Sequence, residues 1–420
     1  MKTLKQQHFF TFIAALWFCL LSGCATTHPS GFRSSESSKP NWLNSILEYE
    51  KTLDRSSPDH IENLFVISPA TKQWVRDHFT QRDKHARAKA LVEWMLDDTG
   101  LDLKYQLGAN LNPQQALNQR QGNCLSFTML LVTLANELDI ELQYNDVDIP
   151  SAWGQDENAG LVFYRHVNAV YKSNSLSQVF DLAMEDYDSA FPQRVISQRA
   201  AAAMFHANLG IDALKKENNQ LALHHSKLSV SMDPDNSYLW INLGVVVKRS
   251  GDLALAERIF KTSLKINDFN SLASSNLERL YREQGRNQLA NVFQKRAERA
   301  RANNPYVQFK RAKEQFGQQN YKVARRHINR AIRLHKLDPK FFEFRSRIHQ
   351  QFKQYRLALV DLKAASDLSN DLKQRGRYYK KGKLIAMRAE QEAQKRESRH
   401  RRSNPEGRPA PRIPLIRGLL

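Results

Sequence analysis

Three side chains in the middle of the chain are of the types that acyl transfer through a thioester requires. They belong to Cys124, His166 and Asp181. In that chemistry a thiolate attacks a carbonyl carbon, an imidazole moves protons and a carboxylate orients the imidazole ring. The three residues lie far apart in the sequence, so secondary structure has to bring them together.

Cys124 stands at the predicted start of a helix. Gly122 and Asn123 supply a turn and an N-cap, and apolar residues then recur every three or four positions. The recurring residues are Cys124, Phe127, Leu131, Leu134 and Leu138. The unpaired amides of a helix start stabilise a thiolate relative to a thiol, which favours a nucleophile here. The same periodicity is compatible with Cys124 as a small apolar residue on the buried face, so the spacing alone leaves both interpretations open.

Two short runs after this helix predict an antiparallel hairpin. Residues 161–171 and 178–183 are rich in β-branched and aromatic side chains. His166 lies on the first strand and Asp181 on the second, so each can project from the sheet face against which the Cys124 helix packs. Taken alone, His166 is better explained as a strand histidine bound to a carbonyl, and Asp181 as a turn or capping carboxylate. Their joint order with Cys124 on a helix and two strands favours a triad.

These residues resemble the bacterial transglutaminase-like family, a papain-type α+β domain with a Cys-His-Asp triad. The resemblance rests on Gly-Asn-Cys-x-Ser at 122–126 opening an apolar helix, followed by the strand with His166 and the strand ending in Asp181. It covers roughly residues 85–190. It implies that Cys124 is the nucleophile, that His166 is the general base and acid, and that Asp181 is the orienting carboxylate.

Two positions depart from the family pattern. Asn168 stands where many relatives carry Trp, and Leu182 where they carry Pro or Thr. Both departures bear on the substrate pocket more than on the triad. For the oxyanion, the Cys124 backbone amide is the obvious donor, and the side chains of Gln119 and Gln121 are further candidates.

The sequence predicts neither a metal site nor a cofactor. His78 and His85 sit on a charged helical stretch, and no His-x-x-x-His or paired-cysteine spacing occurs nearby. His224 and His225 are adjacent, so their side chains are expected to diverge on a helix. A Gly-rich phosphate loop and a Gly-x-Ser-x-Gly elbow are both missing from the sequence.

The first segment has the sections of an export signal. Lys2 and Lys5 precede an apolar run over residues 9–21, which is too short to span a membrane comfortably, and Leu-Ser-Gly-Cys ends at Cys24. This ending resembles the bacterial lipoprotein signal, which implies cleavage before Cys24 and lipidation of its thiol. By the same resemblance, Ala25 favours the outer membrane. An ordinary secretory signal with a chance cysteine is the alternative.

Cleavage there would leave the mature chain with one unmodified cysteine. Cys19 is lost with residues 1–23, and Cys24 is acylated, so Cys124 has no thiol partner. In an oxidising compartment a lone thiol is a liability unless it is buried or used. The residues up to 41, rich in Ser, Thr and Pro, are typical of a flexible tether.

The second half contains an internal repeat. Five alanines follow one another at intervals of 34 residues, each preceded by an apolar residue, and small residues recur in phase with them. The alanines are Ala222, Ala256, Ala290, Ala324 and Ala358. The period and pattern resemble the tetratricopeptide repeat, strongly over residues 203–268 and more faintly over 271–368. The resemblance implies helical hairpins stacked into a right-handed solenoid, whose concave groove holds a peptide or a partner helix.

The two halves differ in charge and should meet different partners. Residues 24–200 hold 16 Lys and Arg against 23 Asp and Glu, whereas residues 201–420 hold 45 against 20. Basic residues are dense within one repeat: Arg311, Lys313, Lys322, Arg325, Arg326, Arg330, Arg333 and Lys336. An acidic protein segment, phosphorylated lipid head groups or another polyanion is the expected partner. Nucleic acid is not expected, because the export signal removes the chain from the cytoplasm and the basic tail has no aromatic stacking residues.

The sequence thus predicts an α+β papain/transglutaminase-like domain followed by an all-α tetratricopeptide-repeat solenoid. The expected parts are a signal peptide 1–23, a tether 24–41, the transglutaminase-like domain 42–200, the repeat array 201–370, and a tail 371–420 that is a charged helix without a sustained apolar stripe to about 400 and then disordered. We expect a lipid-anchored outer-membrane protein facing the periplasm. Its triad would hydrolyse or transfer amide or peptide bonds, with hydrolysis favoured, and its repeats would dock a protein partner or substrate.

Two other hypotheses remain. In one, the chain is a non-catalytic repeat scaffold with a buried, unreactive Cys124 that binds an anionic partner. In the other, the basic array and tail bind anionic polymers of the cell envelope.

Overall fold

The computed structural model describes residues 40–149, 153–156, 160–163, 165–173, 177–182, 191–369 and 372–403. The chain divides into two compact units between Asn44 and Ser45, and every element discussed below lies in the second unit except α2 (Asn41–Leu47), which crosses the division. The predicted signal peptide, Cys24 and the tail beyond residue 403 lie outside the described residues. Across the described ranges, no helix has both the length and the apolar character needed to cross a membrane.

Short helices precede the helix that carries the cysteine. They are η1 (Tyr49–Thr52), α3 (Ile61–Leu64), α4 (Pro69–His78), α5 (Lys84–Leu96) and α6 (Pro113–Gln119). One face of α5 is packed, since its Ala88, Leu91 and Met95 are all buried. Two very short strands, β1 (Lys104–Tyr105) and β2 (Gln121–Gly122), pair in parallel just before Cys124.

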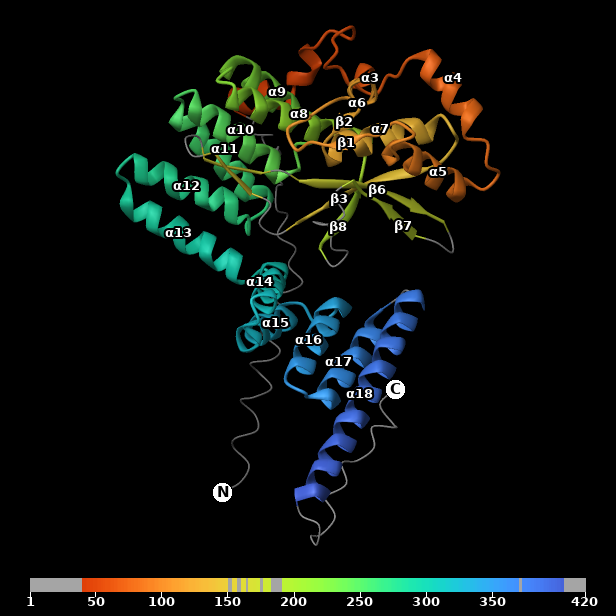
Figure 1. The fold of residues 1–420 in the computed structure, drawn as a ribbon. Helices are drawn as coiled ribbons and strands as arrows, with labels where there is room; N and C mark the ends of the chain where they lie inside the picture. Colours follow the sequence, from red (N-terminus) through yellow and green to blue (C-terminus); the bar gives the residue numbers. More distant parts are fainter. Residues whose placement is uncertain are drawn as a thin grey trace, which may run out of the picture. The chain divides into compact units, whose positions relative to one another are not determined.

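Helix α7 (Cys124–Asn136) packs against the main sheet (Figure 1). The sheet has the strand order β7-β6-β3-β8, and all three pairings are antiparallel. Its strands are β3 (Leu142–Val147), β6 (His166–Lys172), β7 (Ser177–Phe180) and β8 (Gln193–Ile196). Residues 125–135 of α7 are all buried, so the helix is covered on every side while Cys124 at its start is half-buried.

The predicted hairpin of two strands is present as β6 and β7, which pair antiparallel.

The first predicted strand, residues 161–171, is in fact two strands. Gly160–Phe163 is β5, which pairs with β4 (Trp153–Asp156) in a separate two-stranded sheet, and β6 begins only at His166. Strand β5 contacts α10 (Ser237–Arg249) and α12 (Ser271–Glu283) of the repeat array. An unbroken apolar run does not reveal where a chain changes its partner strand, and this is why the sequence suggested a single strand.

The second half is an array of antiparallel helical hairpins. Its helices are α8 (Gln198–Lys215), α9 (Asn219–Met232), α10 (Ser237–Arg249), α11 (Leu253–Ile266), α12 (Ser271–Glu283), α13 (Asn287–Ala302), α14 (Pro305–Gly317), α15 (Tyr321–Leu334), α16 (Pro339–Gln351) and α17 (Tyr355–Leu368). All five alanines of the 34-residue series are fully buried. The described chain is thus mostly helical, with a small sheet region and the predicted C-terminal helical-repeat array.

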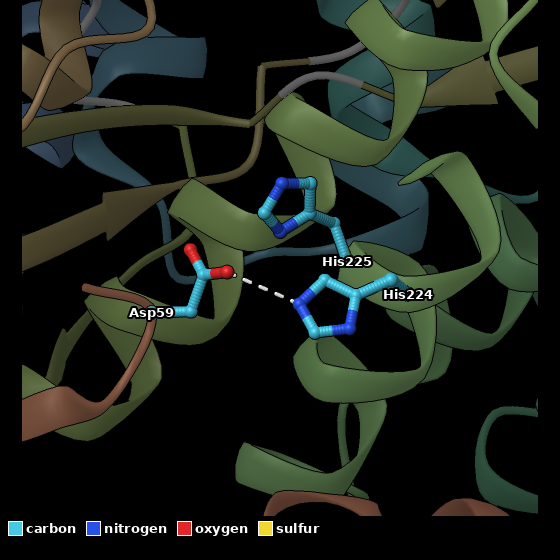
Figure 2. A group of neighbouring side chains, drawn as sticks. All are labelled: Asp59, His224 and His225. Carbon is cyan, nitrogen blue, oxygen red and sulfur yellow. Dashed lines mark hydrogen bonds and ion pairs between the residues drawn. The ribbon is translucent and has the colours of Figure 1, made fainter. Parts of the chain in front are cut away.

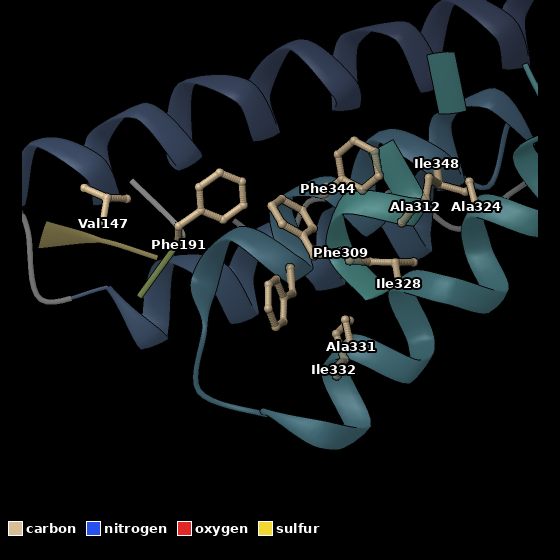
Figure 3. Close-up of a cluster of buried hydrophobic side chains, with 11 residues drawn as sticks. Val147, Phe191, Phe309, Ala312, Ala324, Ile328, Ala331, Ile332, Phe344 and Ile348 are labelled. Atoms are coloured by element: carbon tan, nitrogen blue, oxygen red, sulfur yellow. The ribbon is translucent and has the colours of Figure 1, made fainter. Parts of the chain in front are cut away.

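The fourth and fifth hairpins share a buried cluster with the end of the main sheet. Phe309, Phe341 and Phe344 belong to it from the repeats. Val147 at the end of β3 and Phe191 before β8 belong to the same cluster (Figure 3). The sheet end and these repeats therefore bury apolar surface together.

The last helix, α18 (Leu372–Ser403), corrects two expectations for the tail. Its Tyr378 and Ile385 are buried in a cluster with residues of α17, so the helix has a packed face that its high charge conceals in the sequence. The helix also runs to Ser403, past the predicted onset of disorder at residue 401.

Gly244 provides a test of the close approach between the two helices of a repeat. A Cβ built there would lie 2.5 Å from the ring of Phe260, which is fully buried. We expect Gly244→Ala to destabilise the protein by about 1–3 kcal/mol, because the core has no room for the methyl group. The measurement is the thermal unfolding midpoint.

Gly317→Ala is the matched control. Nothing lies within 4 Å of a Cβ at this helical position, so alanine should be neutral or should stabilise by up to about 1 kcal/mol. Equal midpoints for the two variants would contradict the predicted overlap.

Candidate catalytic site

The histidine and the aspartate are brought together by the pairing of β6 with β7. His166 is the first residue of β6, and Asp181 directly follows the last residue of β7. Nε2 of His166 lies 2.5 Å from Oδ2 of Asp181, and both residues are buried. The carboxylate thus holds one ring nitrogen, leaving Nδ1 to face another group.

The cysteine is presented by the N-terminus of α7. The Asn123 side chain accepts a hydrogen bond of 2.9 Å from the Ser126 amide, which caps the helix as predicted. One turn further, the Thr128 hydroxyl lies 2.7 Å from the Cys124 carbonyl oxygen and 3.1 Å from the carbonyl oxygen of Val167, the residue after His166. This contact ties the start of the helix to the start of β6.

The Cys124 side chain lies close enough to the His166 ring to affect its protonation, so the three predicted residues are neighbours. Burial opposes the protonated ring, but the hydrogen bond to Asp181 and the interaction with Cys124 favour it more strongly, and together they raise the pKa of His166 from 6.5 to about 10. This direction favours the imidazolium form. A cation in that position stabilises a thiolate beside it.

A buried amide network positions Asp181. Asn168 lies two residues after His166 on the same strand, hence on the same sheet face, and its Nδ2 donates to Oδ2 of Asp181 at 3.0 Å. Asn145 on β3 donates to Oδ1 of Asn168 at 2.8 Å and to Oε1 of Gln193 at 2.9 Å. In the sequence, Asn168 stands out only as a departure from the family pattern, although its spacing of two residues from His166 is a signal that both side chains lie on one sheet face.

The oxyanion candidates differ in their surroundings. The Nε2 of Gln121 donates to Oε1 of Gln119 at 3.1 Å, so these two side chains bind each other. The amide of Cys124 lies at the first position of α7, where backbone amides have no acceptor within the helix.

A buried ion cluster adjoins the histidine. Asp146 on β3 is fully buried and binds Arg165, the residue before His166, and also Arg194 with an Nε to Oδ2 distance of 3.0 Å. The guanidinium of Arg165 stands 5.0 Å from the centroid of the Tyr238 ring on α10. Burial also raises the pKa of nearby Asp148, despite the opposing attraction of Arg165. Nothing in the sequence pattern indicated this cluster, because its members come from three strand ends and one helix.

This cluster lines a cavity of about 390 Å³ between the sheet end and the first repeats. Arg165 and Asp148 contribute from the sheet side, and Tyr238 and Ile266 from the repeats. A second cavity, of about 300 Å³, is lined by Gln121, Asn110 and residues of α8 and α9.

The expectation that His224 and His225 diverge is wrong. The His224 side chain contacts Asp59, and one ligand atom from each of Asp59, His224 and His225 lies within 4.8 Å of the others. They are the residues of the described part of the chain that could hold a metal ion. No spacing in the sequence indicates this group, because Asp59 lies in a loop far along the chain from the two histidines.

Comparisons with known proteins find only distant likenesses. No protein-family model matches the chain, and no curated protein matches it. Among solved structures, the Cut9–Hcn1 hetero-tetramer of the APC/C aligns at 18% identity over 44% of this chain and 36% of that one, with a TM-score of 0.24. The Pseudomonas aeruginosa protein PilF aligns at 17% identity over 50% of this chain and 96% of its own, also with a TM-score of 0.24. MamA of Desulfovibrio magneticus aligns at 14% identity over 40% and 94%, with a TM-score of 0.23.

Replacing Asp181 tests the coupling within the triad. Asp181→Asn removes the carboxylate that raises the pKa of His166, so the ring should lose its proton at lower pH. We expect the pH profile of Cys124 alkylation by iodoacetamide to shift to higher pH, because a ring that holds its proton less tightly stabilises the neighbouring thiolate less. The measurement is the alkylation rate from pH 5 to pH 9.

The assay uses protein in which Cys19 and Cys24 are serine, so that Cys124 is the sole thiol. Asp77→Asn, at an exposed aspartate of α4, is the control and should leave the profile unchanged. A profile for Asp181→Asn that matches this control would contradict the coupling.

Proposed function

We propose that the chain is a cysteine-dependent enzyme that hydrolyses amide or peptide bonds, or transfers their acyl groups. The observation that supports this most directly is the contiguous arrangement of Cys124, His166 and Asp181, with Cys124 at a helix start and only half-buried. The proposal includes a papain/transglutaminase-like fold for residues 42–200. A helix that packs its N-terminal cysteine against an antiparallel sheet carrying the histidine and the aspartate is consistent with it.

The residues would act in two half-reactions. The Cys124 thiolate attacks the carbonyl carbon of the amide, and the His166 imidazolium gives its proton to the leaving nitrogen as the carbon–nitrogen bond breaks. A thioester and a free amine result. In the second half, His166 takes a proton from water, whose oxygen displaces the sulfur and releases a carboxylic acid. An acceptor amine in place of water would give transfer.

We further propose that the protein is exported and anchored in the outer membrane through lipidated Cys24, facing the periplasm. The support for this part is the Leu-Ser-Gly-Cys ending of the apolar segment at residues 21–24. Peptide bonds in periplasmic or envelope proteins would then be the accessible substrates.

Covalent labelling tests the nucleophile. Wild-type protein should form an adduct with an electrophilic acyl probe such as a peptidyl acyloxymethyl ketone, and Cys124→Ala should abolish the adduct because the attacking sulfur is gone. The readout is the mass of the intact protein. Cys24→Ser is the control. It lacks the lipid expected on Cys24, so its starting mass differs, but the mass added by the probe should equal that of the wild type.

Labelling that persists in Cys124→Ala would refute the nucleophile. If neither protein labels and Cys124 also resists iodoacetamide at pH 7, the scaffold hypothesis replaces the enzyme.

A second candidate function is docking of an acidic partner by the repeat array. Burial and the charges of Arg311, Arg326 and Arg330 lower the pKa of His327 on α15, which indicates a concentrated positive field over the fourth hairpin. We define the basic face as these three arginines; Arg311 and Arg326 lie exposed on α14 and α15. Such a field attracts anionic segments over a distance of about 8–10 Å at ordinary ionic strength.

Charge reversal tests the basic face. Arg311→Glu combined with Arg326→Glu should weaken binding of a fluorescent poly-glutamate peptide by at least about ten-fold at low salt, because attraction becomes repulsion. Fluorescence anisotropy measures the affinity at several salt concentrations. The control, Lys89→Glu with Lys265→Glu, makes the same change of net charge at exposed positions elsewhere. Equal loss in both double variants would mean that net charge matters and the basic face does not.

A further inference from the structure

A group of polar side chains lies where the segment before α3 meets the first helical hairpin. Asp59 comes from the loop between η1 and α3, and His224 and His225 come from α9 (Figure 2). No residue of the candidate triad takes part in this group. Helix α9 also contacts η1, so the two segments already pack against each other around it.

The three side chains converge. Nε2 of His224 lies 3.1 Å from Oδ2 of Asp59, and the ligand atoms of Asp59, His224 and His225 are all within 4.8 Å of one another. The His225 side chain is buried, whereas the side chains of His224 and Asp59 are 24% and 28% exposed. The group thus has a buried side and a side that solvent reaches, which an entering ion requires.

Each histidine is oriented by a second partner. The hydroxyl of Tyr49 lies 3.0 Å from Nδ1 of His224, which leaves Nε2 of that ring directed at Asp59. Nδ1 of His206 on α8 lies 3.2 Å from Nδ1 of His225. Histidines that bind metals are commonly held in this way, with a neighbouring group fixing the tautomer and the ring orientation.

The neighbouring His206, which faces His225 through Nδ1, has another ring nitrogen that the packing leaves unpaired. Its ring is fully buried, and its Nε2 has no hydrogen-bond partner. A buried polar atom without a partner destabilises the fold, and such atoms are rare outside sites with a function.

We propose that Asp59, His224 and His225 form a binding site for a divalent transition-metal ion, with Zn²⁺ the best match. Two imidazole nitrogens and one carboxylate oxygen are a donor set that zinc accepts, with water in a fourth position. Magnesium and calcium prefer oxygen donors alone. Tyr49 and His206 are positioning residues that do not touch the ion.

The consequence of such a site is structural. Asp59 and His224 are 165 positions apart in the sequence, so the site exists only when the chain is folded. An ion bound there would join the N-terminal segment to the first repeat and would stabilise the folded state in proportion to the logarithm of the free ion concentration.

The first experiment measures binding of Zn²⁺ alone. It uses the full chain without a histidine tag and with Cys19→Ser, Cys24→Ser and Cys124→Ala, so that zinc at a thiolate does not contribute. We expect one zinc per chain by elemental analysis after gel filtration, and a rise of the thermal midpoint that a chelator reverses. Co²⁺ should give the intense visible absorption of a four-coordinate site. Less than one zinc per chain together with only weak, six-coordinate cobalt absorption would overturn the proposal without any substitution at the site.

The second experiment assigns the ligands in the same background. Asp59→Asn and His224→Gln should each lower the zinc affinity by at least ten-fold, and Tyr49→Phe should lower it by roughly ten-fold, as expected for a residue that orients a ligand. His78→Gln, at an exposed histidine of α4, should leave it unchanged. If Asp59→Asn and His224→Gln both bind zinc like His78→Gln, the ion is held elsewhere and the assignment is wrong.

Discussion

The contact between the start of α7 and the start of β6 is the constraint on which the candidate site depends. Thr128 links the two elements through the Val167 carbonyl, and this link places the Cys124 side chain beside the His166 ring. Asp181 reaches the same ring from the next strand because β7 ends one residue earlier. Almost all other residues of α7 are buried, and a helix packed on all sides cannot rotate or slide. The position of Cys124, its first residue, is therefore fixed relative to His166.

A comparable constraint governs the repeat array. Small side chains at fixed intervals allow the two helices of each hairpin to approach, and the five alanines are all without solvent exposure. The charged residues lie on the outside of the array. Close packing of its helices therefore depends on the small size of these buried side chains. Its last helix, α18, adds Tyr378 and Ile385 to close the apolar surface of α17.

The sequence predicted local patterns well and lateral partners poorly. The N-cap at Asn123, the hairpin that carries His166 and Asp181, and the period of 34 residues each follow from spacing within one segment, and the structure has all of them. The division of residues 161–171 into β5 and β6 depends on which strand lies alongside, which composition does not encode. The meeting of Asp59 with His224 depends on how a loop folds back over a helix. The packed face of helix α18 is hidden in the sequence for a related reason, because two buried residues among many charged ones do not form a recognisable apolar stripe.

The ion cluster next to His166 limits how this protein can diverge. Asp146 has no exposure to solvent and is shared by Arg165 and Arg194. Losing the carboxylate alone would strand the Arg165 cation in the interior, at a cost of about 3–5 kcal/mol, whereas exchanging both members for apolar residues of similar size can be nearly neutral. Homologues should therefore either keep this pair or lose it as a unit, and position 165 is expected to covary with position 146 on β3.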